Sequence, residues 1–168
     1  MLALILIVTG ILCRFLPHMP NVSPVAAIAL FGAAYLPNRK LALIVPLLLM
    51  IASDAILGFH NIILFTWGSV LLISALGLAL KKSNKTTKIL LGSLLGSIAF
   101  FAITNFGVWF MGWYPRTSAG LAQCFIAGIP FFRNFLASTL IYSFGLFGAY
   151  ELSAKFIRNT RFSNVLLH

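Results

Sequence analysis

The sequence predicts an all-α fold, namely a polytopic membrane protein that forms a bundle of six transmembrane helices. Of the 168 residues, 61% are hydrophobic and only 8% are charged, whereas a soluble domain carries about 25% charged residues. The mean hydropathy of +1.03 indicates more apolar surface than a water-soluble chain of this length can bury. The apolar run 70–80 lacks the alternation of a barrel strand, so helices are the expected spanning elements.

Prolines, glycines and polar turns divide the chain into six apolar segments within one integral membrane domain, 1–168. Pro17 ends the first segment, and Ser23 with Pro24 reads as an N-cap followed by proline in the first turn of the second. Pro46 is expected to kink the third segment. Lipid-spanning helices need roughly 20 apolar residues, and the expected spans are 2–16, 24–36, 41–58, 62–80, 89–111 and 131–156.

One further apolar stretch, 119–129, is too short to cross a bilayer. Pro130 separates it from the last expected span, and proline interrupts the hydrogen-bond ladder of a helix. We therefore expect 119–129 to form a separate re-entrant or interfacial helix.

The distribution of basic residues predicts the orientation. If the N-terminus is cytoplasmic, nine Lys and Arg fall on the cytoplasmic side and three, Arg14, Arg116 and Arg133, on the other. Cytoplasmic loops carry an excess of Lys and Arg, so both termini are expected at the cytoplasmic face of a bacterial inner membrane. The net charge of +10 does not indicate a nucleic-acid partner, because the basic residues are scattered between apolar runs rather than gathered in a stripe. The expected environment is the lipid bilayer.

Asp54 is the residue that most strongly indicates a site. It lies in an apolar run about one turn from the outer end of its span, where an ionised carboxylate is costly unless it is paired or hydrated. Its natural partners are the three arginines of the same side, Arg14, Arg116 and Arg133. The sequence leaves two readings open, a structural ion pair with Arg14 or a polar cavity that opens outward.

The hypothesis of a cavity includes the polar and aromatic residues at the outer ends of several spans. Tryptophans would wall a planar solute, and arginines suit a carboxylate or phosphate through bidentate hydrogen bonds. The competing readings are an interfacial aromatic belt and ordinary loop residues. The candidate substrate-binding residues are Arg14, Asp54, His60, Asn105, Trp109, Trp113, Arg116, Arg133 and Asn134.

Small residues line one face of the second segment. Ala29 and Ala33 lie four apart, with Ala26 one turn earlier, and small residues at this spacing let helices approach closely in lipid. The motif does not say whose helix is met. It fits tight packing inside the bundle, and it also fits a docking face for a partner subunit.

The sequence gives no sign of an enzyme. It contains no nucleophile elbow, P-loop or dinucleotide fingerprint. Its histidines lack the spacing of metal ligands, and Cys13 and Cys124 read as packing residues. We expect no catalytic residues, no cofactor and no metal.

Several stretches together resemble an uncharacterised bacterial family described as putative transport proteins, which is in turn similar to the substrate-binding S components of energy-coupling factor (ECF) transporters. The stretches are 21–27 (NVSPVAA), 53–60 (SDAILGFH), 104–109 (TNFGVW), 114–117 (YPRT) and 130–134 (PFFRN). The resemblance implies a six-helix bundle that binds a vitamin or related micronutrient from the outer side. It also implies a membrane coupling subunit with paired ATPases, docked on Ala29, Ala33 and their neighbours.

Two functions remain as hypotheses. The first is a substrate-binding or transport subunit for a small water-soluble micronutrient, such as a vitamin or cofactor precursor. The alternative is a non-transport membrane scaffold or assembly subunit that acts through helix–helix contacts. A stoichiometric small-molecule ligand would distinguish the first from the second.

Overall fold

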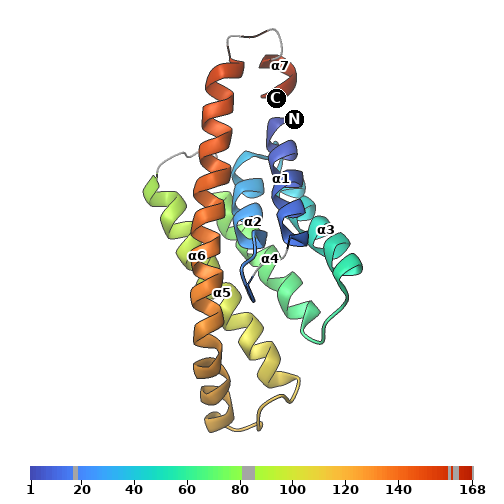
Figure 1. Cartoon of the computed structure of the whole chain (residues 1–168), viewed down its shortest axis with the longest axis vertical. Helices are drawn as coiled ribbons and strands as arrows, with labels where there is room; N and C mark the ends of the chain where they lie inside the picture. Colours follow the sequence, from blue (N-terminus) through green and yellow to red (C-terminus); the bar gives the residue numbers. More distant parts are fainter. Residues whose placement is uncertain (17–18, 81–85, 159, 161–162, 168) are drawn as a thin grey trace.

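The computed structural model describes residues 1–16, 19–80, 86–158, 160 and 163–167. All regular structure within these ranges is helical (Figure 1). The prediction that Pro17 ends the first segment, and the cytoplasmic position predicted for the lysines within 81–85, concern residues outside these ranges. The elements are α1 (Leu2–Leu12), η1 (Cys13–Phe15), α2 (Val25–Tyr35), α3 (Arg39–Leu57), α4 (Ile63–Gly77), η2 (Leu78–Leu80), α5 (Thr86–Phe110), α6 (Ser118–Ile157) and α7 (Ser163–Leu166).

Local signals in the sequence explain where several helices begin and end. Asn38 caps α3, since its side-chain oxygen accepts a hydrogen bond from the backbone N–H of Leu41 at 2.8 Å. Thr117 caps α6 in the same way through the N–H of Gly120 at 3.0 Å. Gly58 ends α3 with φ of +104°, a conformation that residues with a side chain rarely adopt.

The expected break at Pro130 is absent, and this corrects the prediction of a separate short helix over 119–129. The structure joins that stretch to the expected last span, 131–156, in one helix of 40 residues, α6. At 1.5 Å per residue, α6 is about 60 Å long. It is the long helix that runs the whole height of Figure 1.

Aromatic packing against α5 explains why α6 continues through Pro130. The ring of Phe101 lies 5.5 Å from that of Phe125 and 4.9 Å from that of Phe132, measured between centroids. One side chain of α5 therefore contacts α6 on both sides of the proline. Proline is tolerated inside membrane helices where neighbouring helices support the backbone.

Among the described residues, four helical stretches are long and apolar enough to cross a membrane, which identifies a membrane protein: α3, α4 with η2, α5 and α6. The apolar stretch Leu2–Phe15 and helix α2 are shorter. With 11 residues, α2 is about 16 Å long, roughly half the hydrocarbon thickness of about 30 Å. Six full spans are therefore not confirmed, and the expected span 24–36 is too short to cross on its own.

Helix α2 lies at the centre of the bundle. Every residue from Val25 to Ala34 is buried, and α1, α3, α4, α5 and α6 all contact the helix. Ala26, Ala29 and Ala33 have no exposed surface. This corrects their prediction as a docking face, because a side chain enclosed by its own bundle cannot contact another subunit; the alternative reading, tight internal packing, describes them.

Both chain ends lie at the same end of the bundle (Figure 1). The N-terminal ammonium of Met1 donates a hydrogen bond to the carbonyl of Leu166 at 3.1 Å. Nearby, the Tyr35 hydroxyl at the end of α2 donates to Glu151 of α6 at 2.6 Å. These contacts join the start of α1 to α7, and α2 to α6, at the end that carries the termini.

We predict that Gly77→Ala destabilises the bundle by about 1–3 kcal/mol, because overpacking displaces neighbouring groups. A Cβ at this position would lie 2.7 Å from the Cβ of Ala33 and 3.0 Å from the Cα of Leu30, both on α2. Gly68→Ala, on the same helix, is the matched control, since nothing lies within 4 Å of its added Cβ. Unfolding in detergent, followed by tryptophan fluorescence, measures both. Equal stability of the two variants would contradict close packing between α2 and α4.

Candidate functional site

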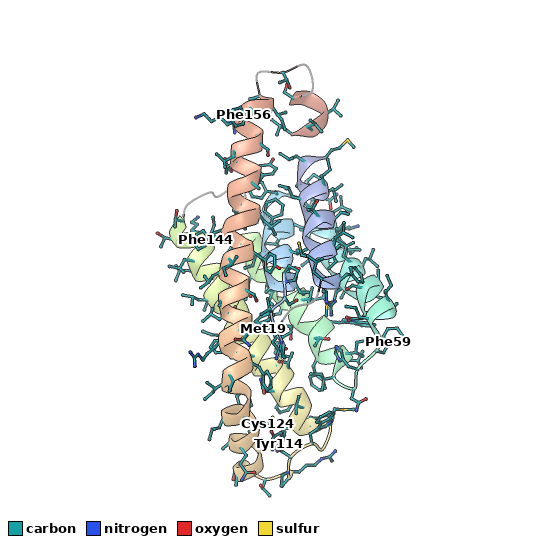
Figure 2. All side chains as sticks on the ribbon, in the orientation of Figure 1. Met19, Phe59, Tyr114, Cys124, Phe144 and Phe156 are labelled. Atoms are coloured by element: carbon teal, nitrogen blue, oxygen red, sulfur yellow. The ribbon has the colours of Figure 1, made fainter. Side chains whose placement is uncertain are left out.

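A cavity of about 930 Å³ lies beyond the N-terminal end of α2. It forms because η1 ends at Phe15 and α2 begins only at Val25, while α5 and α6 extend further in the same direction (Figure 1). Lining residues come from 14–16, the segment 21–25, α3 and α4 with the turn between them, the facing sides of α5 and α6, and the turn that joins these two helices. Figure 2 shows Tyr114 and Cys124, two of the lining residues, at the far end between α5 and α6.

Arg14 and Asp54 form an ion pair at the wall of this cavity. The Arg14 Nη2 atom lies 2.6 Å from Asp54 Oδ1. The Nη1 atom of Arg14 donates to the hydroxyl of Ser53 and contacts the sulfur of Met50. Arg14 lines the cavity with 14% of its side chain exposed, whereas Asp54 lies behind it and is 1% exposed. Of the two interpretations of Asp54, the structure therefore shows the ion pair with Arg14.

Trp67 completes this network and was not among the predicted site residues. Its indole Nε1–H donates to Asp54 Oδ2 at 2.9 Å, so both carboxylate oxygens are hydrogen-bonded. The pair thereby links η1, α3 and α4. A buried charge pair is stable only when its remaining hydrogen-bonding groups are satisfied, and Trp67 provides this.

Phenylalanines from α5 and α6 form an aromatic floor to the cavity. Phe100 stacks on Phe135 with ring centroids 4.2 Å apart and ring planes at 16°. Phe101 and Phe132 make a second pair at 4.9 Å. All four line the cavity. None of them was predicted as a site residue.

Asn105 lines the cavity at a point where α5 and α6 touch. Its side-chain N–H donates to the backbone carbonyl of Phe101 at 2.8 Å. The backbone carbonyl of Asn105 accepts a hydrogen bond from the thiol of Cys124 at 3.3 Å. The side-chain oxygen faces Gly128, where an added Cβ would collide with it. Asn105 thus brings a neutral amide into the part of the wall that α5 and α6 form.

Trp113 and His60 also line the cavity and are exposed. The exposed fraction of Trp113 is 67%, which fits a residue at the opening rather than inside. Asn21 and Asn61 lie on the same lining and are exposed as well. The residues that are both exposed and on the lining therefore combine neutral polar side chains and one imidazole with apolar side chains, among them Leu16, Leu57 and Phe131.

Trp109 and Arg116 are not on the cavity lining. The indole N–H of Trp109 donates to the carbonyl of Pro115 at 2.9 Å. Arg116 donates to the carbonyl of Phe110 at 3.1 Å and lies over the ring of that residue, 5.8 Å from its centroid. Both contacts join the last residues of α5 to the turn that follows it.

Arg133 and Asn134 lie on α6 outside the lining. Arg133 is exposed. The amide of Asn134 donates to the carbonyl of Pro20 at 3.2 Å, which attaches the segment before α2 to α6. Of the nine predicted site residues, the structure brings four onto the cavity lining: Arg14, His60, Asn105 and Trp113.

The chain matches a family model along almost its entire length, residues 1–161. It belongs to the DUF6580 family. The description of DUF6580 is a family of unknown function. No curated protein and no solved structure matches the chain. The whole cavity lining, from Arg14 to Phe135, falls within the DUF6580 match.

We predict that Arg14→Ala and Asp54→Ala in this DUF6580 protein each destabilise the fold by about 3–5 kcal/mol, because each leaves one buried charge without its partner. The double variant should lose much less than the sum of the single losses, since it leaves no unpaired charge.

A double-mutant cycle on unfolding in detergent measures this coupling. Arg116→Ala serves as the control, with an expected change within about 0.5 kcal/mol for an exposed side chain. Additive losses for Arg14 and Asp54 would contradict a coupled pair.

Proposed function

We propose that this DUF6580 protein captures a small water-soluble solute, such as a vitamin or cofactor precursor, as a substrate-binding or transport subunit of a bacterial inner membrane. The observation that supports this is the cavity of about 930 Å³. Small-molecule sites are typically concave, about 300–1,000 Å³ in volume, and mostly apolar with a few placed polar groups. The cavity has this size and this mixture of residues.

The lining favours a planar solute. The stacked rings of Phe100 and Phe135 and the paired rings of Phe101 and Phe132 offer flat apolar contact. Aromatic faces contribute about 0.5–1.5 kcal/mol per ring pair beyond the burial of area. The amide of Asn105 and the other neutral polar residues supply hydrogen bonds that would orient the molecule.

The distribution of charge supports capture from the outer face. Basic residues lie at the starts of α3 and α5 and at the end of α6, and an excess of Lys and Arg is typical of the cytoplasmic side. The cavity is at the opposite ends of these helices. With both termini cytoplasmic, the opening near Trp113 faces outward.

The resemblance to ECF S components supports the same proposal and adds a partner, a membrane coupling subunit with ATPases. The chain has no nucleotide-binding motif of its own. In this proposal, the short helices α1 and α2 and the four long helices together form the six-helix membrane domain. The burial of Ala29 and Ala33 removes the alanine face of α2 as the docking surface for that coupling subunit, and removes it equally as a contact surface for the scaffold alternative.

We predict that native mass spectrometry of the gently purified protein detects one small molecule per chain. Phe100→Leu should weaken its retention roughly 3- to 10-fold, because the ring contact is lost while the position stays apolar. Arg133→Ala is the control, since this side chain is exposed and off the lining, and it should leave retention unchanged.

Two outcomes would contradict the proposal. One is a protein that folds but carries no small molecule and takes none up from a bacterial extract. The other is equal retention by the Phe100→Leu and wild-type proteins, which would place the solute elsewhere.

A further inference from the structure

The charges around the cavity carry information about the solute. Among the described lining residues there is no Asp, Glu or Lys, and Arg14 is the only permanently charged side chain. The other basic residues of this end, Arg116 and Arg133, are exposed and lie off the lining. His60 is exposed at the opening. The charge that a solute meets deep in the cavity is therefore set by Arg14 and its partner.

The partner cancels that charge. Asp54 lies 2.6 Å from the Arg14 guanidinium and is 1% exposed, so the two form a buried pair of zero net charge. Both carboxylate oxygens are already bonded, one by Arg14 and the other by Trp67 at 2.9 Å. The guanidinium is held in addition by Ser53 and Met50. Neither member of the pair is free to turn toward a new ionic partner without leaving the other unpaired.

We infer that the solute is uncharged: a planar ring molecule recognised through neutral carbonyl, amide or hydroxyl groups. An anion entering the cavity would lose its hydration without meeting an uncompensated positive charge. A cation would meet no carboxylate, since Asp54 is occupied. Residues with neutral hydrogen-bonding side chains are on the lining, namely Asn21, Asn61, Asn105, Ser23, Thr66 and Thr104.

This inference rests on the proposed function and changes the chemistry that the sequence favoured. Unpaired arginines would select a carboxylate or phosphate. The fold instead places one arginine in an internal pair and the other two outside the cavity. The solute then owes its affinity to ring contacts and neutral hydrogen bonds.

The test compares matched probes that differ by one ionised group, applied to the full-length protein in lipid nanodiscs. The pairs are nicotinamide with nicotinate and riboflavin with riboflavin 5′-phosphate. Binding is measured by calorimetry and by thermal shift at neutral pH. For any pair that binds, the uncharged member should bind at least about 10-fold more tightly, since a desolvated charge without a partner is disfavoured.

A variant that changes the net charge of the pair tests the same inference in the opposite direction. Asp54→Asn keeps the shape of the side chain but leaves Arg14 with an uncompensated positive charge, so the preference should move toward the anionic member by about 10-fold. Glu151→Gln is the matched control, because it neutralises the other acid of the chain, which bonds Tyr35 at the opposite end. It should leave the preference unchanged. If Asp54→Asn does not fold, the comparison of uncharged and anionic probes on the wild-type protein still tests the inference.

The outcomes separate the two proposals. Tighter binding of the anionic members to the wild-type protein would overturn the inference and leave the proposed function intact. Binding of neither member of any pair, together with no co-purified molecule, would overturn the proposed function and the inference with it. An equal shift in Asp54→Asn and Glu151→Gln would show that the pair does not set the selectivity.

Discussion

The fold depends on a short helix enclosed by longer ones. Helix α2 has 11 residues, and each from Val25 to Ala34 is buried. Its alanines and Gly32 let the surrounding helices approach closely, and close packing is the main source of helix association in lipid. Because α2 is too short to fill the height of the bundle, the space beyond its N-terminus is left to side chains from η1, α5 and α6. The cavity is therefore a direct consequence of the length of α2.

Electrostatics at the edge of this space fixes the neighbouring helices. Arg14 follows α1, Asp54 is near the end of α3, and Trp67 is in α4, so one hydrogen-bonded network joins three elements. Burying the two charges costs free energy that their attraction and the added hydrogen bonds must offset. The network positions the end of α1 against the bundle. It also leaves the cavity wall with a polar surface and no net charge.

The sequence was a good guide to helix positions and a weaker guide to contacts. Apolar runs punctuated by proline, glycine and polar turns located the helices, since in lipid each run must satisfy its own backbone. Pro130 was misleading because Phe101 supports α6 on both sides of it, a tertiary effect without a local signal. The spacing of Ala29 and Ala33 predicted close packing, but a spacing rule cannot say which helix supplies the contact.

The site could be predicted only in part, because the sequence shows which residue needs a partner but not which residue supplies the contact. Asp54 required a partner, and Arg14 was one of three candidates. Trp67 could have been predicted. Asp54 precedes the turn between α3 and α4 by about as many residues as Trp67 follows it, and two helices joined by a short turn bring such residues together. The phenylalanines of the floor could not, because in a chain with 16 phenylalanines an apolar ring that faces lipid has the same sequence signature as one that lines a cavity.

The floor also limits what the chain can do in this conformation. Beyond Phe100 and Phe135, the interface of α5 and α6 continues through Ser97 and Thr139 to the bonded pair Ser93 and Ser143, all of them without exposed surface. These buried side chains and α2 therefore close the route from the cavity toward the end that carries the termini. Passage to the other face requires α2 to separate from α5 or α6, or the whole bundle to reorient in the membrane. Tight packing around α2 opposes the first, so the proposed transport role would depend on the second movement rather than on separation of α2 from its neighbours.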